Sequence, residues 1–477
     1  MNPALSSMAL PLLAGLLLLL AGPGLMRRWG GTLTLIVSVA SGLAAWMALQ
    51  STLDSSRQEA LLGGWEEGLA IRLELTALSA LLLLFTALIH GLVALYAQFS
   101  RHGVSHAYWP LSCLLHGTLA ALWLSGDLFN LYVTLELLGL VSVALLTQSG
   151  PRAWRPALNY LVLSLAASLC YLLGVAILYG QYGLLDIELL SGVTENDAVT
   201  RLALVLMTGG LMLKAAMWPL HGWLPAAHAS APTAVSALLS ALVVKGPLFI
   251  LWRLWSEVAP ADLAIQAGPL FAAAGIAALI GGGYASLRSP YIKTLVAYST
   301  VAQMGYAMMA LGLLLFWQHP QMHVALWLFV IAHGLAKASL FMAAGEIQHT
   351  VGTTRISGLR GATQTAPIAM FAFAVAGGSL IGLPPSGGFL SKWVLLGPLL
   401  NDPWNWPWAA GVFLGTLVSA AYVFRAVIMA FDRVHIKRVN LNPDHTAQWL
   451  AMLPALLVWA MALSGNWLVQ WLAGGGI

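Results

Sequence analysis

The chain has 477 residues, of which 60% are hydrophobic and 8% are charged, and its formal net charge is +4. Soluble domains carry about 25% charged residues, so this composition excludes a soluble globular protein and predicts one that crosses a membrane many times. Apolar windows occupy most of the length, which leaves almost nothing for a soluble domain.

Windows of about twenty apolar residues, long enough to span a hydrocarbon core of about 30 Å, recur along the whole chain. We predict an all-α polytopic membrane protein with about fourteen transmembrane helices. Their approximate ranges are 8–26, 31–50, 75–98, 108–126, 128–148, 156–181, 200–225, 232–254, 263–286, 292–315, 322–347, 366–400, 406–431 and 447–473. Basic residues follow the first window rather than precede it, the reverse of a cleaved signal peptide, so we expect this helix to remain in the mature protein.

The charged residues between these windows alternate in sign from loop to loop. One set of loops carries basic residues, including Arg27, Arg28, Arg152, Arg155 and Arg288. The other set holds most of the acids, including Glu59, Asp186, Glu188, Glu195, Asp197, Glu257 and Asp262. Because basic loops stay in the cytoplasm, this asymmetry predicts an even number of spans with both termini on the outer face.

Four lysines lie deep inside apolar windows, at Lys214, Lys245, Lys337 and Lys392, and Glu136 is the only acid that we expect at a comparable depth. A charge at the centre of a bilayer costs from about 3 to more than 10 kcal/mol, so such a residue usually faces a polar path lined by protein. The pattern therefore indicates ion translocation, most directly of protons.

Two windows contain prolines that should break their helices. Pro219 interrupts the window 200–225, and Pro384 with Pro385 interrupts the window 366–400. A break persists inside a membrane only where protein or a wet cavity covers it. Lys214 and Lys392 lie close to the two breaks, which favours an internal repeat with an ion site at each one, although prolines are common in membrane helices and chance is the alternative.

This pattern divides the chain into four parts. Residues 1–107 hold three N-terminal transmembrane helices, and residues 432–477 hold a loop and the last helix. Residues 108–257 and 258–431 are two predicted five-helix repeats, each with one broken helix. An odd number of helices in each unit makes the two repeats inverted.

Motifs for cofactors and metals are missing from the sequence. Cys113 and Cys170 form no CxxC or Cys/His spacing, and we expect both to be small core residues. The glycines lie within apolar helices, and the run 281–283 is better explained by close helix packing than by phosphate binding. We predict no cofactor, no metal and no catalytic or redox centre in this chain.

Several longer motifs occur in a fixed order between about residues 75 and 431. They are GDLFNLYV at 126–133 followed by Glu136, HGWLP at 221–225 followed by APT at 231–233, YSTVAQMGY at 298–306, and LPPSGGF at 383–389. In these the chain resembles the antiporter-like family, which comprises the ion-translocating subunits of respiratory complex I, of membrane-bound hydrogenases and of Mrp-type sodium/proton antiporters. The first motif is most similar to the Mrp D-type branch and its hydrogenase relatives.

The resemblance implies a proton relay at mid-membrane. The residues that match the family's relay are Glu136, Lys214, Lys245, His333, Lys337 and Lys392. Polar residues that could support it are Asp127, Tyr132, His221, His228, Ser299, Thr300 and Gln303. Where the family often carries an Asp and a Glu around the HGWLP segment, this chain has Ala226 and Ser230, which puts a cation-binding role of that loop in doubt.

The chemistry of a relay also follows from the residue types. Burial destabilises an ammonium group, and a nearby carboxylate stabilises it, so an ion pair that opens and closes can move a proton. A lysine suits this role better than an arginine, which stays protonated. The alternatives are a static Glu136–Lys214 pair, a Lys245 that only binds carbonyls freed by Pro247, and an Asp127 that only caps a helix. His90 and His116 lack charged neighbours at helical spacing, and we expect them in the core.

Three functions remain open. The first is a proton-translocating subunit of a multisubunit membrane complex, with Mrp-type cation/proton antiport favoured over proton pumping in a complex I-like or hydrogenase-type complex. The second is a self-contained secondary transporter, and the third is a membrane enzyme subunit that handles quinone or lipid. The resemblance implies homologous antiporter-like and small membrane subunits as partners, in a bacterial or archaeal cytoplasmic membrane. With one deep acid the chain is poor in the oxygen ligands that Na⁺ prefers, so we expect any sodium path in a partner.

Overall fold

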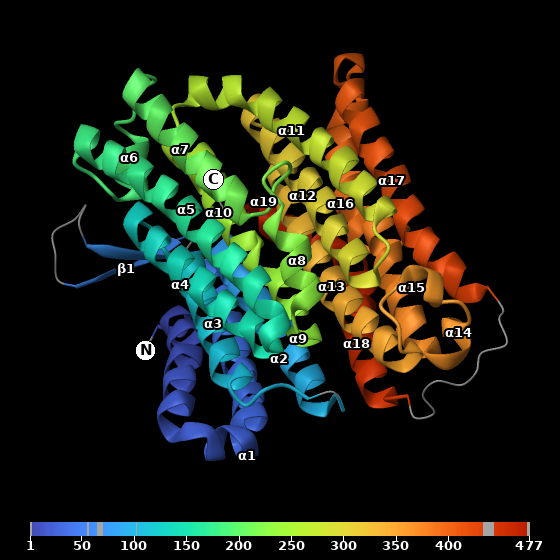
Figure 1. Ribbon diagram of the computed structural model, residues 1–477. Coiled ribbons are helices and arrows are strands. Elements are labelled where there is room, and N and C mark those ends of the chain that lie inside the picture. The colour runs from blue at the N-terminus through green and yellow to red at the C-terminus, as the bar shows by residue number, and fades with distance from the viewer. Residues whose placement is uncertain (1, 55–56, 64–69, 102, 433–442, 475–477) are drawn as a thin grey trace.

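The computed structural model describes residues 2–54, 57–63, 70–101, 103–432 and 443–474. Long helices packed side by side form nearly all of it, with one small β-hairpin (Figure 1). The predicted all-α polytopic class is confirmed. Among the described residues, nine helices are long and apolar enough to span a membrane and others are shorter, so the count of about fourteen spans stays a prediction.

The first two predicted spans are two helical segments that together carry the label α1 (Pro3–Asp54) and meet at a sharp kink at Gly22, where φ is 79° (Figure 1). The connection between them differs from the prediction in one detail. Because a glycine adopts positive φ without a steric penalty, the chain turns there, and Arg27 and Arg28, predicted to lie in a loop, are helical. Then follow α2 (Ala77–Phe99) and α3 (Tyr108–Leu124).

An antiparallel hairpin of β1 (Arg57–Leu62) and β2 (Ile71–Thr76) was not predicted. Ion pairs fasten β2 to the helices beside it. Arg72 binds Asp186 with an N–O distance of 3.0 Å, and Glu74 binds Arg253 at 2.9 Å. The hairpin therefore belongs to the body of the protein rather than to a free loop.

The middle of the chain folds into helices around the first predicted break. In chain order they are α4 (Leu128–Leu146), the 3₁₀ turn Thr147–Ser149, α5 (Pro151–Tyr182), α6 (Ile187–Ser191), α7 (Ala198–Lys214), α8 (Trp223–Ser230), α9 (Thr233–Leu238), the π-helical turn Leu239–Val243, α10 (Lys245–Arg253) and the π-helical turn Leu254–Val258. The predicted break at Pro219 is confirmed, because the chain leaves the helix after Lys214 and becomes helical again at Trp223.

The second half contains the second break. Its helices are α11 (Ala261–Arg288), α12 (Ile292–Trp317), α13 (Pro320–Val351), the 3₁₀ turn Ile356–Gly358, α14 (Ala362–Thr365), α15 (Pro367–Ile381), α16 (Gly387–Leu400), the 3₁₀ turn Pro403–Asn405 and α17 (Trp406–Phe431). Between α15 and α16 the chain turns at Gly382, with φ of 91°, and the Ser386 side chain caps α16. The predicted break is confirmed.

The last predicted span, 447–473, is itself divided into α18 (His445–Ala460) and α19 (Gly465–Gly474), which the sequence had not indicated. At the centre of the molecule lies α13, whose apolar window is buried along its whole length, whereas α1 is largely exposed at the edge. A helix covered on all sides must present every polar side chain to other protein groups, and α13 carries His333 and Lys337.

Glycines bring α11 and α12 into backbone contact, as the sequence predicted for the run 281–283. A Cβ on Gly275 would lie 2.5 Å from the Gly305 oxygen, and one on Gly282 would lie 2.6 Å from the Ala302 nitrogen. Both distances are too short for a side chain, so the antiparallel pair depends on these small residues. Arg425 of α17 donates to the carbonyls of Leu287 and Ser289 and so fixes the end of α11.

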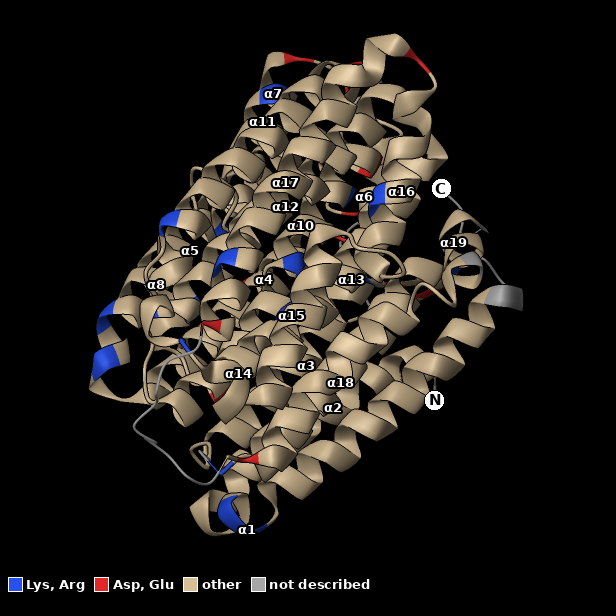
Figure 2. Ribbon diagram, turned by 90° about the vertical axis from the view of Figure 1, so that its right-hand side faces the viewer, with Lys and Arg blue, Asp and Glu red and all other residues tan. Residues whose placement is uncertain are grey.

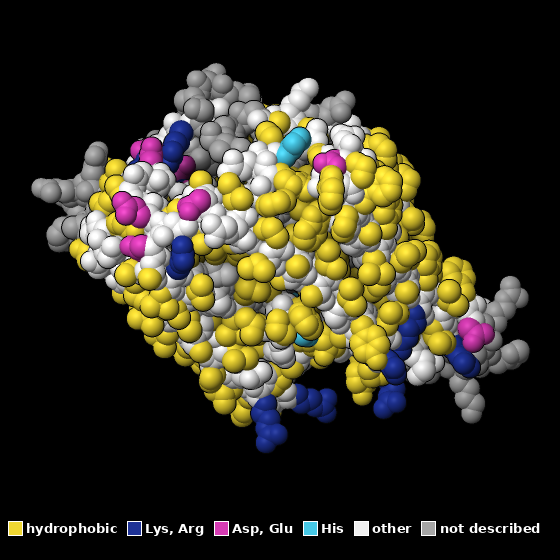
Figure 3. Space-filling view, turned by 90° about the horizontal axis from the view of Figure 1, so that it is seen from above, with side chains coloured by type: hydrophobic (Ala, Val, Ile, Leu, Met, Phe, Trp, Pro, Cys, Tyr) yellow, Lys and Arg dark blue, Asp and Glu magenta, His cyan; other side chains and the backbone are white. Residues whose placement is uncertain are grey.

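Charges separate between the two ends of the bundle. Figure 2 shows most acidic segments toward the upper end and basic segments toward the lower end and its flank, and Figure 3 shows acidic side chains gathered over part of the upper face. Asn2 lines a small cavity with Glu59 and Glu74, and Leu472 of α19 hydrogen-bonds His323 near the start of α13. Both terminal segments thus approach the end that carries the acidic loops.

We predict that Gly275→Val destabilises the protein by about 1–3 kcal/mol or more, because the added side chain overpacks the α11–α12 contact. Gly209→Val is a matched control, since a Cβ there meets nothing within 4 Å. Thermal unfolding of the purified protein in detergent, followed by size-exclusion chromatography, measures the difference. Equal stability of the two variants would contradict the packing argument.

Candidate functional site

The four deep lysines are all buried, with side chains that bind protein oxygens rather than facing lipid. Their exposed fractions are 6% for Lys214, 1% for Lys245, 0% for Lys337 and 5% for Lys392. Three of them lie beside a helix irregularity. Lys214 ends α7 at the first break, Lys245 follows a π-helical turn, and Lys392 lies in the second turn of α16 after the second break.

Glu136 and Lys214 form an ion pair between α4 and α7. The Lys214 Nζ donates to the Glu136 Oε2 at 3.3 Å and to the Leu135 oxygen at 3.1 Å. The hydroxyl of Ser168 on α5 donates to the same carboxylate oxygen. Because the Glu136 side chain keeps an exposed fraction of 17%, one side of the pair reaches the surface of this chain.

The broken helix is held in place by aromatic side chains. The Trp223 indole donates to the Leu213 oxygen at 2.9 Å, and its ring stacks on Tyr160 with centroids 4.1 Å apart. This contact closes the break and fixes the end of α7. Gly139 leaves room on α4 for α5, since a Cβ there would lie 2.7 Å from the Ser164 hydroxyl oxygen.

Lys245 and Lys337 belong to one buried polar cluster. The Lys245 Nζ donates to the Ser240 carbonyl in the π-helical turn, and the Ser240 hydroxyl lies 2.9 Å from that of Thr300. Thr300 donates to the Val296 carbonyl at 3.2 Å, and the Lys337 Nζ donates to the same carbonyl at 2.9 Å.

Lys337 also donates to the Ser299 hydroxyl. Ser299 and Thr300, expected as supporting residues, thus belong to the hydrogen-bonded cluster around Lys245 and Lys337. Lys245 binds the carbonyl of Ser240 in a π-helical turn, seven residues before Pro247, within a cluster that also holds a second lysine.

Two histidines border this cluster. His333 stacks on Phe329 with centroids 5.5 Å apart and interacts electrostatically with Lys245 and Lys337. His228 stacks on Phe341 at 4.5 Å and interacts with the same two lysines. Among the described residues, neither ring nitrogen of either histidine has a protein hydrogen-bond partner, which is unusual for buried polar atoms.

Lys392 binds the end of α15. Its Nζ donates to the carbonyls of Leu380 at 3.0 Å and Ile381 at 2.9 Å, and it lies 4.3 Å from the centroid of the Tyr306 ring. An ammonium group at the C-terminal carbonyls of a helix is favoured by the unpaired carbonyls and by the helix dipole.

Gln303 shares a backbone carbonyl with Lys392 and lies on the same helix as Ser299 of the central cluster. Its amide donates to the same Leu380 carbonyl at 3.4 Å and to Ser419 and Tyr422 at 2.9 Å. It lies on α12 four residues after Ser299, on the same face.

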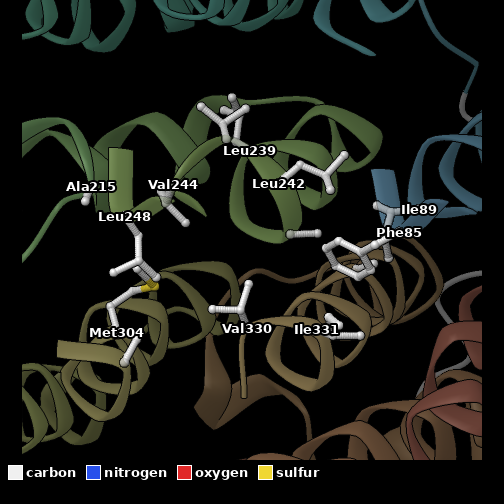
Figure 4. Close-up of a cluster of buried hydrophobic side chains, with 14 of the residues drawn as sticks. Phe85, Ile89, Ala215, Leu239, Leu242, Val244, Leu248, Met304, Val330 and Ile331 are labelled. Carbon is white, nitrogen blue, oxygen red and sulfur yellow. The ribbon is translucent and has the colours of Figure 1, made fainter. Parts of the chain in front are cut away.

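The structure does not join Lys214 to Lys245. Within the part of the chain that the structure describes, no hydrogen bond or electrostatic interaction links them. Ala215, next to Lys214, and Val244 and Leu248, which flank Lys245, belong to one cluster of buried apolar side chains (Figure 4). The basic residues therefore form the ion pair on one side and, on the other, a polar file that runs from Lys245 and Lys337 past Gln303 to Lys392, in which no hydrogen bond of the described structure joins Ser299 to Gln303.

Three supporting residues lie away from the lysines. Asp127 accepts the backbone N–H of Asn130 at 2.6 Å and of Arg72 at 3.3 Å, so it caps α4 and anchors the hairpin. Tyr132 lies beside Phe129 with ring centroids 6.0 Å apart. His221 packs on the edge of Tyr298 at 5.9 Å. The contacts of these three residues stabilise the structure around them and do not reach the lysines in the described part of the chain.

Three buried polar residues were missed by sequence reasoning. Ser168 binds Glu136, and Lys293, at the start of the predicted window 292–315, is buried and donates to the Ala231 carbonyl at 3.3 Å. Glu346 on α13 is completely buried, so Glu136 is not the only deep acid. It lies near the end of the predicted window 322–347, where Tyr96 of α2 packs against it.

Two minor expectations about the core also have outcomes. Cys113 is buried as expected, but Cys170 is exposed on the outer side of α5, so its prediction was wrong. His90 and His116 are buried core residues with ring centroids 4.8 Å apart.

Residues 125–418 match the family described as NADH:quinone oxidoreductase/Mrp antiporter, TM. The chain belongs to this family. The match covers both helix breaks and all six residues of the predicted relay, from Glu136 to Lys392. The family resemblance in the sequence motifs is confirmed.

Two of the relatives come from different kinds of complex. The chain is 35% identical to the N subunit of the NADH-quinone oxidoreductase of Desulforudis audaxviator, over 77% of this chain and 74% of the relative. It is 29% identical to the D subunit of the Na(+)/H(+) antiporter of Alkalihalophilus pseudofirmus, over 78% and 75%.

Solved structures share the fold over nearly the whole length. A chain in the Mrp complex from Dietzia sp. has a TM-score of 0.87 at 24% identity, covering 99% of this chain and 96% of that one. A chain in respiratory complex I from Thermus thermophilus has a TM-score of 0.84 at 25% identity, covering 99% and 98%. The architecture is therefore common to both kinds of assembly.

We predict that Ser168→Ala slows proton movement roughly tenfold, because a hydrogen bond to a charged group contributes about 1.5–3 kcal/mol. Ser164→Ala, one helical turn earlier on α5, is the control, since no hydrogen bond from Ser164 to Glu136 occurs in the described structure. Both variants are measured in membrane vesicles with a pH-sensitive dye. An unchanged rate in Ser168→Ala would show that this hydroxyl does not set the state of Glu136.

Proposed function

We propose that this chain is the proton-translocating, antiporter-like subunit of a multisubunit membrane complex. The observation that carries the proposal is the buried polar file from Lys245 through Lys337 to Lys392, with the Glu136–Lys214 ion pair across an apolar interval from it. Buried ammonium groups are expensive, and a line of them is explained by the transport of charge.

Cation/proton antiport of the Mrp type is the function that we favour. The GDLFNLYV motif at 126–133 supports it, as does the relative from an Na(+)/H(+) antiporter. The second candidate is proton pumping in a redox complex, favoured by the 35% identity to a subunit of an NADH-quinone oxidoreductase. Both candidates use the same relay and differ in the partner that supplies the driving force.

A quinone- or lipid-handling enzyme is less well supported. No group of metal-ligating side chains occurs among the described residues. The ammonium groups of Lys337 and Lys392 point at carbonyls and hydroxyls between helices rather than at one leaflet. Such contacts suit a relay within the membrane better than a grip on a lipid head group.

The proposed relay works through the stability of buried charge. When the Glu136–Lys214 pair is closed, the carboxylate stabilises the ammonium form of Lys214. When the pair opens, that stabilisation is lost and the proton can leave. Lys245 and Lys337 interact electrostatically, so a proton that arrives at one disfavours a proton on the other. Protonation of one member therefore drives release from the next, toward Lys392.

We further propose that residues 108–257 and 258–431 are inverted repeats. Each would hold one broken helix, α7–α8 or α15–α16, with a lysine close to the break. The basic loops would face the cytoplasm, and both termini the outer side. Homologous antiporter-like subunits and small membrane subunits would be the partners, and any sodium path would lie largely in one of them.

Lys214→Arg distinguishes a working relay from a static pair. Arginine keeps the positive charge and can bind Glu136, but it does not release its proton, so we predict that proton transport is lost while assembly is retained. Transport is measured in vesicles that contain the complete complex, and assembly by size-exclusion chromatography.

Glu136→Gln should also abolish transport. If Lys214→Arg transported protons at the normal rate, the pair would be structural and the relay assignment would fail.

Lys392→Ala should block proton exchange at its end of the relay, because no other lysine binds the α15 carbonyls in the described structure. Trp393→Ala is the neighbouring control, since its side chain faces outward with an exposed fraction of 64%. Initial rates in vesicles of known orientation measure both. Normal transport by Lys392→Ala would place the exit elsewhere.

A further inference from the structure

A second buried acid lies on the central helix, outside the relay described above. Glu346 of α13 has an exposed fraction of 0%, and the Tyr96 hydroxyl of α2 donates to its Oε1 at 2.6 Å. A carboxyl group in this position loses its hydration, which is costly unless the group has a role or strong partners. It lies near the end of α13 that points toward the basic loops.

The groups around Glu346 come from several elements. Asp444, which caps α18 and accepts the Arg101 backbone N–H at 2.8 Å, interacts with it electrostatically. Tyr96 also bonds with the Thr233 side chain at the start of α9. Thr233 lies against Gly345, where a Cβ would come within 2.4 Å of its hydroxyl oxygen. A glycine next to Glu346 therefore lets the threonine approach.

Ser236 and His228 are the next polar groups from Thr233 toward the central lysines. Ser236, one turn further on α9, donates to the His228 backbone carbonyl at 3.2 Å. The His228 ring is buried, has no protein hydrogen bond on either nitrogen among the described residues, and interacts electrostatically with Lys337 and Lys293. It packs on Phe341, which lies between Lys337 and Glu346 on α13. Buried polar groups thus occur at intervals from Asp444 to mid-membrane, and a proton that passes between them needs bridging water.

We propose that the Tyr96–Glu346 pair is the proton-access site between the relay and the face of the protein that carries the basic loops. The inference rests on the proposed function and adds the route by which protons enter or leave. Glu346 takes a proton from water on the side of Asp444 and becomes a neutral carboxylic acid. Its O–H bond then breaks as the proton passes to the Tyr96 hydroxyl oxygen, and that hydroxyl passes its own proton to the Thr233 oxygen. Thr233 in turn gives up its hydroxyl proton through bridging water to one nitrogen of the His228 ring, which releases a proton through water to Lys337 and returns to neutral.

The sequence of steps returns Tyr96 to its starting state and leaves Glu346 as a carboxylate. The proton ends on the amine of Lys337, which becomes an ammonium group, so charge and protons balance. The reverse order of the same steps releases a proton to the basic-loop face. Asp444, placed between α2 and α18, is the group that first attracts the proton from that side.

The test compares Glu346→Gln, Tyr96→Phe and Glu136→Gln in vesicles that hold the complete complex. Glu195→Gln, an exposed acid at the opposite end, is the control. Glu346→Gln should lower the rate of proton transport by about 100-fold at neutral pH, the lower range for loss of a proton-transfer group. The rate should then rise about tenfold per unit as the pH on the basic-loop side falls, because protons must reach the relay without the carboxylate.

Tyr96→Phe should give a smaller loss of the same kind. A normal rate and pH profile in Glu346→Gln, with Glu136→Gln inactive, would overturn the access site and leave the proposed function intact. Loss of assembled complex with a normal rate per complex would also overturn it, because Glu346 would then be structural. If Glu136→Gln transported normally as well, the proposed function itself would fail.

Discussion

The binding of buried ammonium groups by protein oxygens is the interaction on which the rest of the structure depends. Lys214 and Lys337 bind carbonyls within the continuous helices α4 and α12, those of Leu135 and Val296. A break or a π-helical turn offers carbonyls that lack a regular helical partner. Lys392 binds carbonyls at the end of α15, and Lys245 binds one in a π-helical turn. Each of these two lysines therefore donates hydrogen bonds to carbonyls that an irregular helix leaves unpaired, which satisfies both groups inside the membrane.

The sequence could predict the helix breaks and the deep lysines, but not how the lysines group together. The breaks at Pro219 and Pro384 follow from the local chemistry of proline, which needs no knowledge of the fold. The deep lysines follow from composition along the chain. Their grouping depended on tertiary packing, because the contact between Lys337 and Ser299 joins α13 to α12. No periodicity in either helix specifies that contact.

The residues that the sequence missed share one physical cause. The β-hairpin has only short strands, and ion pairs such as Arg72–Asp186, between positions far apart in the chain, hold it in place. Lys293 and Glu346 lie near the ends of their helices, where charged residues normally reach water. Their burial comes from neighbours that cover the helix ends, such as Tyr96 over Glu346. An apolar window shows how far a residue lies from the ends of its own helix, but it does not show whether a neighbouring helix buries that residue.

An apolar interval separates Lys214 from Lys245 and limits how a proton could pass along the proposed relay. No hydrogen bond crosses it in the described structure, and Ala215, Val244 and Leu248, beside the two lysines, are buried apolar side chains (Figure 4). Burial among apolar side chains leaves each ammonium group dependent on the few oxygens that it contacts. Under the proposed function, proton transfer across the interval therefore requires a rearrangement that brings water or other polar groups between Lys214 and Lys245.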